Sequence, residues 1–215
     1  MTQRTVLEVF KEPLVLASSS PRRAEILRSV GWPFVVARGA VDEARHANED
    51  AVAYVRRLAQ AKASAAATGL SSGLVLGADT VVVVDREILG QPRDDEDARR
   101  MLELLRGRWH DVLTGVALVR AGEQNNCVVD HEVTRVRFKP MSATEVAWYV
   151  STREPLGKAG AYAIQGRAAL FIEEIQGDYF NIVGLPIKRV FELCNAAVFQ
   201  QPVKKKSRPV RRPSS

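Results

Sequence analysis

The segment SSSPRR, residues 18–23, combines hydroxyl and guanidinium groups at the start of an expected helix. A helix N-terminus presents unsatisfied backbone N–H groups and a partial positive charge, and therefore attracts phosphate. Ser18 and Ser20 add hydroxyl donors. Arg22 and Arg23 oppose the helix dipole in the first turn, which is understandable if an anion binds in front of them. The alternative is a capped helix with solvated arginines, and these residues alone leave both interpretations open.

One acid interrupts the apolar run LVLGADTVVVV, residues 74–84. A carboxylate in so apolar a strand is costly unless it is paired, hydrogen-bonded or bound to a metal. Asp79 is therefore a candidate to hold a divalent cation or to take a proton from attacking water. The alternative is that Asp79 caps a turn, because Gly77 and Thr80 lie beside it.

The stretch LGKAGAYAIQGRAALF, residues 156–171, places Lys158, Tyr162 and Gln165 among glycines. Such a loop can approach a flat ligand closely, and the Gln165 amide offers a donor and an acceptor to the edge of a base. A purely structural glycine loop is the alternative. Glu43 and Lys62 could add complementary charge, although their residue types alone give them no priority.

Several familiar site types are absent from the sequence. It contains no phosphate-loop lysine motif, no GxGxxG after a strand, no HExxH and no CxxC. The three histidines and the two cysteines show no metal-ligand spacing. The residues by themselves therefore indicate a protein with a phosphate site and a buried acid.

Alternating strands and helices must position these side chains, and they predict an α/β protein with a mixed β-sheet. Apolar periodicity, turn residues and helix caps predict the boundaries. Strands are expected at residues 14–17, 34–37, 74–84, 88–89, 111–119, 128–138 and 169–175, and helices at 21–30, 48–68, from 92 onward, 142–150 and 186–199.

The length of 215 residues suits one α/β domain, or two small lobes that share a cleft. No run approaches the roughly 20 apolar residues of a membrane-spanning helix. The N-terminal segment lacks the pattern of a signal peptide, so we expect a cytoplasmic protein with no membrane partner. The cysteines Cys127 and Cys194 suit a reducing compartment.

The net charge of +6 belongs to the C-terminus. Residues 204–215, KKKSRPVRRPSS, hold 6 of the 31 bases and no acid, and the remaining 25 bases equal the 25 acids. We expect a folded domain over residues 1–203 and a basic disordered tail over 204–215. The tail is a solubilising end or attaches weakly to RNA or another polyanion; otherwise no nucleic-acid partner is expected.

Six motifs together resemble the Maf family. They are LASSSPRRAEIL, the pair Lys62-Ala63, GADTVVVV, LGQP, YVSTREPLGKAGAYAIQG and GDYFNIVGLP, in the family's order from Leu14 to Leu193. The resemblance implies two lobes around a deep cleft, similar to the inosine-triphosphate pyrophosphatase fold. It also implies a divalent cation (Mg or Mn), a homodimer, and hydrolysis of nucleoside triphosphates to monophosphate and pyrophosphate.

The resemblance also implies roles for single residues. Asp79 matches the proposed proton acceptor and, with Glu43, a place for the metal. The expected substrate-binding residues are Ser20, Arg22, Arg23, Lys62, Thr80, Lys158 and Gln165. Among them Arg22, Thr80 and Gln165 match positions associated with substrate choice. KAGAYAIQG resembles the branch that takes dTTP and UTP. Gln165 accordingly favours a pyrimidine, because its amide can pair with the O4/N3 edge of the base.

Gln91 departs from the family pattern, which usually has lysine at this position of LGKP. The departure removes one cation, so either Arg93 or Lys158 compensates or turnover is reduced. Arg106 also replaces a usual serine, at a position expected to matter less. Two alternatives therefore stay open: a nucleotide-binding regulator with weak hydrolysis, and a pyrophosphatase for 7-methyl-GTP or a modified pyrimidine triphosphate.

Overall fold

The protein is built around one mixed β-sheet. The computed structural model describes residues 9–11, 13–123 and 126–199. Within them the strand order is β2-β1-β3-β5-β6-β7, with β4 also paired to β3. The strands are β1 (Leu14–Leu16), β2 (Phe34–Val36), β3 (Leu74–Val84), β4 (Glu87–Leu89), β5 (Trp109–Arg120), β6 (Cys127–Phe138) and β7 (Ile172–Gln176). β1 runs parallel to β2 and β3, and the other pairs are antiparallel.

The edge of β3 opposite β5 contains a gap. β1 pairs with residues 74–76 of β3, and β4 pairs with residues 82–84. The sheet register thus leaves residues 77–81 of β3 without a neighbouring strand on this side within the described chain. Asp79 and Thr80 lie in the middle of the gap, so their side chains can reach a common space from opposite faces of the strand.

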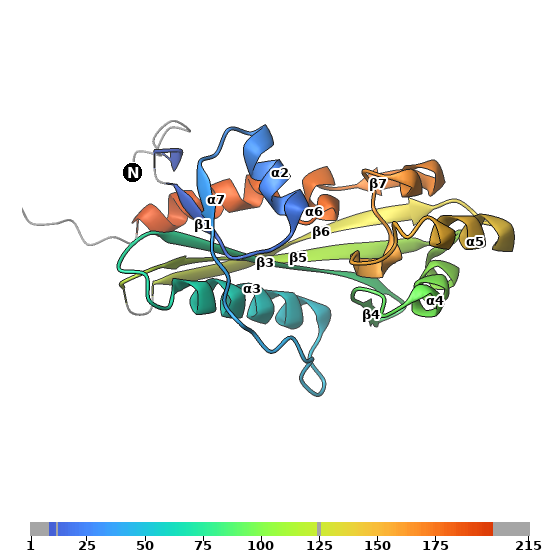
Figure 1. The fold of residues 1–215 in the computed structure, drawn as a ribbon, viewed down its shortest axis with the longest axis horizontal. Helices are drawn as coiled ribbons and strands as arrows, with labels where there is room; N and C mark the ends of the chain where they lie inside the picture. The colour runs from blue at the N-terminus through green and yellow to red at the C-terminus, as the bar shows by residue number, and fades with distance from the viewer. Residues whose placement is uncertain (1–8, 12, 124–125, 200–215) are drawn as a thin grey trace, which may run out of the picture.

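Helices cover both faces of the sheet (Figure 1). α3 (Ala51–Ala67) lies along one face, while α2 (Pro21–Ser29), α6 (Tyr179–Val183) and α7 (Ile187–Phe199) cover the other. α3 approaches closely because glycines lie beneath it: a Cβ on Gly77 would fall 2.1 Å from the Ala59 carbonyl oxygen, and one on Gly115 would fall 2.2 Å from that of Val55. This packing fixes the height of α3, and of Lys62 on it, above β3.

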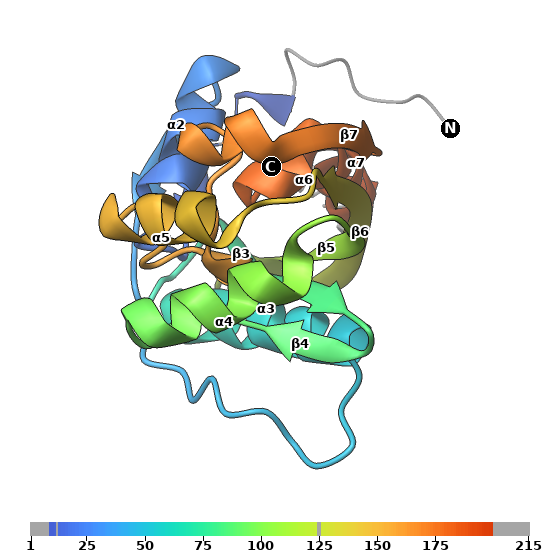
Figure 2. The same cartoon turned by 90° about the vertical axis from the view of Figure 1, so that its right-hand side faces the viewer.

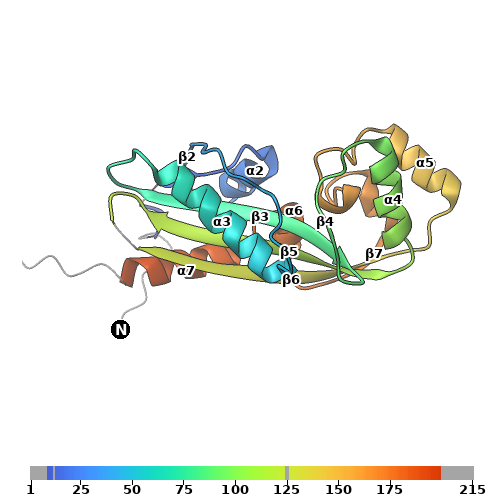
Figure 3. The same ribbon diagram turned by 90° about the horizontal axis from the view of Figure 1, so that it is seen from below.

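The two largest hydrophobic clusters of the described residues lie in two different lobes. One core lies beneath α2 and α7 and includes Leu16, Leu27 and Leu76. The other joins α4 (Asp95–Leu105) and α5 (Ala143–Ser151), with Leu102 and Tyr149 fully buried. Figure 2 shows α4 and α5 from the end of the molecule, and Figure 3 shows β3, β5 and β6 continuing beneath both lobes. The predicted two-lobed α/β architecture is confirmed.

Most predicted elements are present, and the differences have local causes. The helix after residue 48 begins at Ala51 because the Asp50 carboxylate accepts from the Ala53 N–H. The strand expected from 169 begins at Ile172, because residues 167–171 form a 3₁₀ helix. Ser20 precedes α2 as expected but makes no side-chain cap. The short helix α6, capped by Asp178, was not predicted.

The described helices include none with both the length and the apolar character needed to cross a membrane. The expected basic tail, residues 204–215, lies outside the described part of the chain.

Candidate functional site

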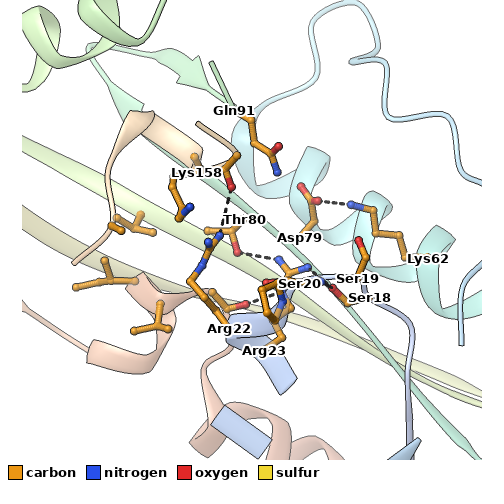
Figure 4. Close-up of a pocket in the computed structure, with 18 of the residues that line it drawn as sticks. Ser18, Ser19, Ser20, Arg22, Arg23, Lys62, Asp79, Thr80, Gln91 and Lys158 are labelled. Carbon is orange, nitrogen blue, oxygen red and sulfur yellow. Dashed lines mark hydrogen bonds and ion pairs between the residues drawn. The ribbon is translucent and has the colours of Figure 1, made fainter. Parts of the chain in front are cut away.

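A cavity of about 420 Å³ opens between the two lobes at the gap in β3 (Figure 4). Every site residue expected from the sequence lines it: Ser20, Arg22, Arg23, Glu43, Lys62, Asp79, Thr80, Lys158 and Gln165. The fold therefore brings together residues that are up to 145 positions apart in the chain. Arg38, which was not predicted as a site residue, also lines the cavity.

Asp79 shares the ammonium group of Lys62 with Glu43. Lys62 Nζ lies 2.6 Å from Asp79 Oδ1 and 2.8 Å from Glu43 Oε1. The Asp79 side chain is 12% exposed, whereas that of Glu43 is 60% exposed. Tyr54 on α3 donates to the Glu43 carbonyl oxygen at 2.9 Å and so holds the loop that carries this acid. The cluster thus joins one buried and one accessible carboxylate around one cation.

Burial raises the pKa of Asp79 above its ordinary value, and the nearby Lys62 ammonium opposes the shift. The alternative in which Asp79 caps a turn is wrong, because Asp79 lies within β3 and its side chain contacts Lys62. A buried carboxyl group with a raised pKa and a single ion-pair partner is a suitable proton acceptor.

Arg23 is fixed by the protein itself. Its guanidinium donates to the Gly184 carbonyl oxygen at 2.8 Å, to Ser18 Oγ at 3.1 Å and to Thr80 Oγ1 at 3.1 Å. Burial lowers the pKa of Arg23, and Asp79 opposes the shift. A guanidinium has five N–H donors, so two remain for a ligand. Arg23 is therefore a rigid cation rather than a solvated helix arginine.

The hydroxyl proton of Thr80 points away from the remaining cavity. Thr80 Oγ1 and Thr114 Oγ1 lie 3.0 Å apart, and Thr114 donates to the Asn181 carbonyl oxygen at 3.1 Å. Because Thr114 has one hydroxyl proton, Thr80 must be the donor in their shared bond. The hydrogen bonds that link Arg23, Thr80, Thr114 and Asn181 thus show that Thr80 holds Arg23. Thr114 and Asn181, which are fully buried, were not predicted to belong to the site.

Two cations approach the cavity from its other wall (Figure 4). Arg22 Nη2 donates to the Gly157 carbonyl oxygen at 3.4 Å, which joins α2 to the loop before the 3₁₀ helix Ala159–Ala161. Lys158 Nζ donates to the Leu156 carbonyl oxygen at 3.2 Å. Burial lowers the pKa of Lys158, and the charge of Arg22 lowers it further. Both cations have backbone acceptors here, which a phosphate could replace.

Gln91 lies in the cavity wall, so the departure from the usual lysine falls within the site. Of the two residues considered as replacements, Lys158 lines the cavity, whereas the side chain of Arg93 is 83% exposed and pairs with Asp97. Arg106 bonds to the Met141 carbonyl oxygen and pairs with Glu103, away from the cavity. Lys158 is thus the cation available to offset Gln91.

The donor set suits a divalent cation that arrives with an anion. Among the described residues, no group of three or more His, Cys, Asp or Glu side chains could hold a metal. Mg²⁺ is commonly held by one or two carboxylates together with substrate phosphates and water. Asp79 and Glu43 provide two carboxylates separated by a single ammonium group, which fits such a shared site.

The comparisons with known proteins agree with this geometry. The family model described as Maf-like protein matches residues 13–197. A dTTP/UTP pyrophosphatase of Symbiobacterium thermophilum is 56% identical over 85% of this chain and 92% of its own length. The dTTP/UTP pyrophosphatase of Moorella thermoacetica is 49% identical over 84% of this chain and 92% of its own length. The Ham1 protein of Staphylococcus aureus shares the fold, with a TM-score of 0.51 at 12% identity over 86% of this chain and 99% of that one.

Proposed function

The chain belongs to the Maf-like protein family, and on this premise we propose that it hydrolyses nucleoside triphosphates to monophosphate and pyrophosphate. The observation that carries the proposal is a buried carboxylate in one cavity with five cationic side chains. They are Arg22, Arg23, Arg38, Lys62 and Lys158. This inventory suits a small polyanion that must meet one base, because phosphoryl transfer depends mainly on positioning and charge neutralisation.

In the proposed reaction Asp79 orients a water molecule and accepts its proton. The water oxygen forms a bond to phosphorus, the P–O bond between the α- and β-phosphates breaks, and pyrophosphate leaves with the bonding electrons. The raised pKa of Asp79 supports its role as the proton acceptor.

The cationic side chains have distinct proposed tasks. Arg23, immobilised by Gly184 and Thr80, presents fixed positive charge to the phosphates. Arg22 and Lys158 can exchange their carbonyl acceptors for phosphate oxygens. When bound by Asp79 and Glu43, a divalent cation (Mg or Mn) would supply further neutralisation of phosphate charge. These groups together offset the charge that develops on the leaving pyrophosphate.

We propose dTTP and UTP as the preferred substrates. The names of the two relatives support this choice, as does the presence of Gln165 in the cavity wall. Its amide can donate to O4 and accept from N3–H of thymine or uracil. A cytoplasmic homodimer is part of the same proposal, supported by the family resemblance, with residues 1–203 as the catalytic domain.

A nucleotide panel with product identification tests the proposal. Purified protein with Mg²⁺ or Mn²⁺ is given dTTP, UTP, dCTP, dGTP and 7-methyl-GTP, and both pyrophosphate and inorganic phosphate are measured. We expect pyrophosphate as the first product and faster turnover of dTTP and UTP. Inorganic phosphate as the first product would refute the cleavage site, and a preference for 7-methyl-GTP would select the alternative substrate.

A further inference from the structure

The loop that carries Gln165 is held by two residues outside the cavity wall. Gln165 lies between Ala163 and Gly166, whose backbone groups bond to each other across it, from Gly166 N to Ala163 O at 3.0 Å. The loop continues into the 3₁₀ helix Arg167–Phe171. The position of the Gln165 amide therefore depends on what anchors residues 163–168.

Tyr149 on α5 anchors the beginning of this loop. Its side chain is fully buried, and its hydroxyl accepts from the Ala163 N–H at 3.2 Å and donates to Glu154 Oε1 at 2.8 Å. Burial raises the pKa of Tyr149, so the hydroxyl keeps the proton that it donates. A buried phenol with both a donor and an acceptor bond is rigidly oriented.

Glu154 anchors the end of the same loop. Its Oε2 accepts from the Arg167 N–H at 3.1 Å and its Oε1 from the Ala168 N–H at 3.4 Å. Gly166 makes this possible, because a Cβ there would lie 2.4 Å from Glu154 Oε1. The Glu154 side chain is 17% exposed, so little water competes for its oxygens.

Tyr149 and Glu154 thus fix the chain on both sides of Gln165 and are bonded to each other. We propose that this pair positions the Gln165 amide and thereby sets the discrimination between nucleobases. The inference rests on the proposed function, because it concerns which base the same site selects. Neither residue lines the cavity, so they act through Gln165 and are positioning residues.

The test compares kcat/KM for dTTP with kcat/KM for dCTP. These substrates have the same polyphosphate and sugar but present opposite donors and acceptors at position 4 of the base. Tyr149→Phe removes one hydroxyl and both of its bonds. Glu154→Gln places an N–H₂ group opposite a backbone N–H. We expect each variant to lower the dTTP:dCTP ratio at least fivefold, as Gln165→Ala should. A ratio does not depend on the folded fraction, so it stays informative if a variant is less stable.

A double mutant separates positioning from general stabilisation. If Tyr149 acts through Gln165, Tyr149→Phe should change the ratio no further in a Gln165→Ala background. Tyr179→Phe, which removes the phenol oxygen of a residue that is 42% exposed, is the matched control and should leave the ratio unchanged.

Each outcome bears on one idea only. Wild-type protein that hydrolyses no nucleoside triphosphate would refute the proposed function. Wild-type protein that prefers dTTP, with Tyr149→Phe and Glu154→Gln variants that keep the full ratio, would overturn the positioning role and leave the proposed function standing. The positioning role would also be overturned if Tyr149→Phe lowered the dTTP:dCTP ratio by the same factor in the Gln165→Ala background as in the wild type.

Discussion

Asp79 owes its chemical character to its surroundings more than to its residue type. The same carboxyl group in water would be ionised and weakly basic, whereas here burial raises its pKa and Lys62 at 2.6 Å limits the rise. Glu43 pairs with the same Lys62 ammonium group. The degree to which Lys62 limits the rise in the pKa of Asp79 therefore depends on the position of the loop that carries Glu43. Small changes around Lys62 should therefore alter catalysis before they alter the fold.

We predict that Asp79→Asn lowers turnover of dTTP by about a hundredfold to ten-thousandfold, the usual contribution of a general base. The amide keeps the shape of the side chain but cannot accept the water proton. Nucleotide affinity measured without added divalent metal should stay close to that of the wild type, because the five cationic side chains of the cavity are untouched. Pyrophosphate release and equilibrium binding measure the two effects. Asp111→Asn is the control, because the Asp111 side chain on β5 is 45% exposed and lies at another position of the sheet. If the Asp79→Asn variant kept wild-type turnover, Asp79 would not be the proton acceptor.

The pH dependence should report Lys158. Its pKa lies below the ordinary lysine value, so its positive charge is present below this lowered pKa and is lost as pH rises through it. We expect kcat/KM for dTTP to fall on the alkaline side as this cation disappears. Lys158→Arg should extend the plateau to higher pH, because a guanidinium stays charged. Lys188→Arg, at a lysine that is 84% exposed, is the control. If the alkaline limb were the same in both variants, Lys158 would not be the group that titrates.

At the scale of elements, the site depends on how closely α3 lies on β3 and β5. α3 carries Lys62 and β3 carries Asp79, and the glycines between them allow backbone-to-backbone approach. An ion pair of 2.6 Å tolerates little displacement of either element. Packing and catalysis are therefore coupled through Gly77 and Gly115.

Gly115→Ala should lower the free energy of unfolding by about 1–3 kcal/mol, which is the typical cost of overpacking. The new Cβ would lie 2.2 Å from the Val55 carbonyl oxygen, so α3 must move. The same movement should reduce turnover in the protein that remains folded. Urea denaturation and pyrophosphate release measure the two effects. Gly90→Ala, with no atom within 4 Å of the added Cβ, should change stability by less than about 0.5 kcal/mol.

Local elements were predictable from the sequence because their signals are local. β3 and the β5–β6 hairpin follow apolar runs, and the start of α5 follows from its cap, Ser142. The candidate site residues were found as motifs, but their contacts were not, because Arg23 bonds to Gly184, 161 positions away. Arg38 lies in no motif that distinguishes it from an ordinary loop residue. Tyr149 and Glu154 lie in the motif YVSTREPLGKAGAYAIQG, but their residue types alone did not indicate a role in holding the loop.

At the scale of the molecule, charge is separated along the chain. Residues 1–203 are formally neutral, yet five cations and two carboxylates line one cavity. The basic residues of 204–215 are therefore not needed to attract a small polyanion to the cavity. A positive cavity in a neutral domain can itself steer nucleotides.

Truncation after Pro202 should leave kcat/KM for dTTP about unchanged, since every residue of the cavity is retained. The same truncation should abolish any salt-sensitive binding to RNA, which requires several cations. Turnover assays and RNA binding at two salt concentrations distinguish the cases. Loss of turnover on truncation would instead favour the regulator, in which the tail and the cavity act together.

The gap in β3 has a consequence for recognition by the main chain. The Leu76 carbonyl oxygen accepts from Ala17 N–H at this edge, and peptide groups of alternate residues of a strand face the same way, so those of Thr80, which lines the cavity, face the opening. These amide and carbonyl groups offer polar contacts that no side-chain substitution deletes. Variants stripped of individual arginines or lysines should consequently retain a residual affinity for nucleotide, and evolution at this site can exchange side chains while an invariant peptide surface remains.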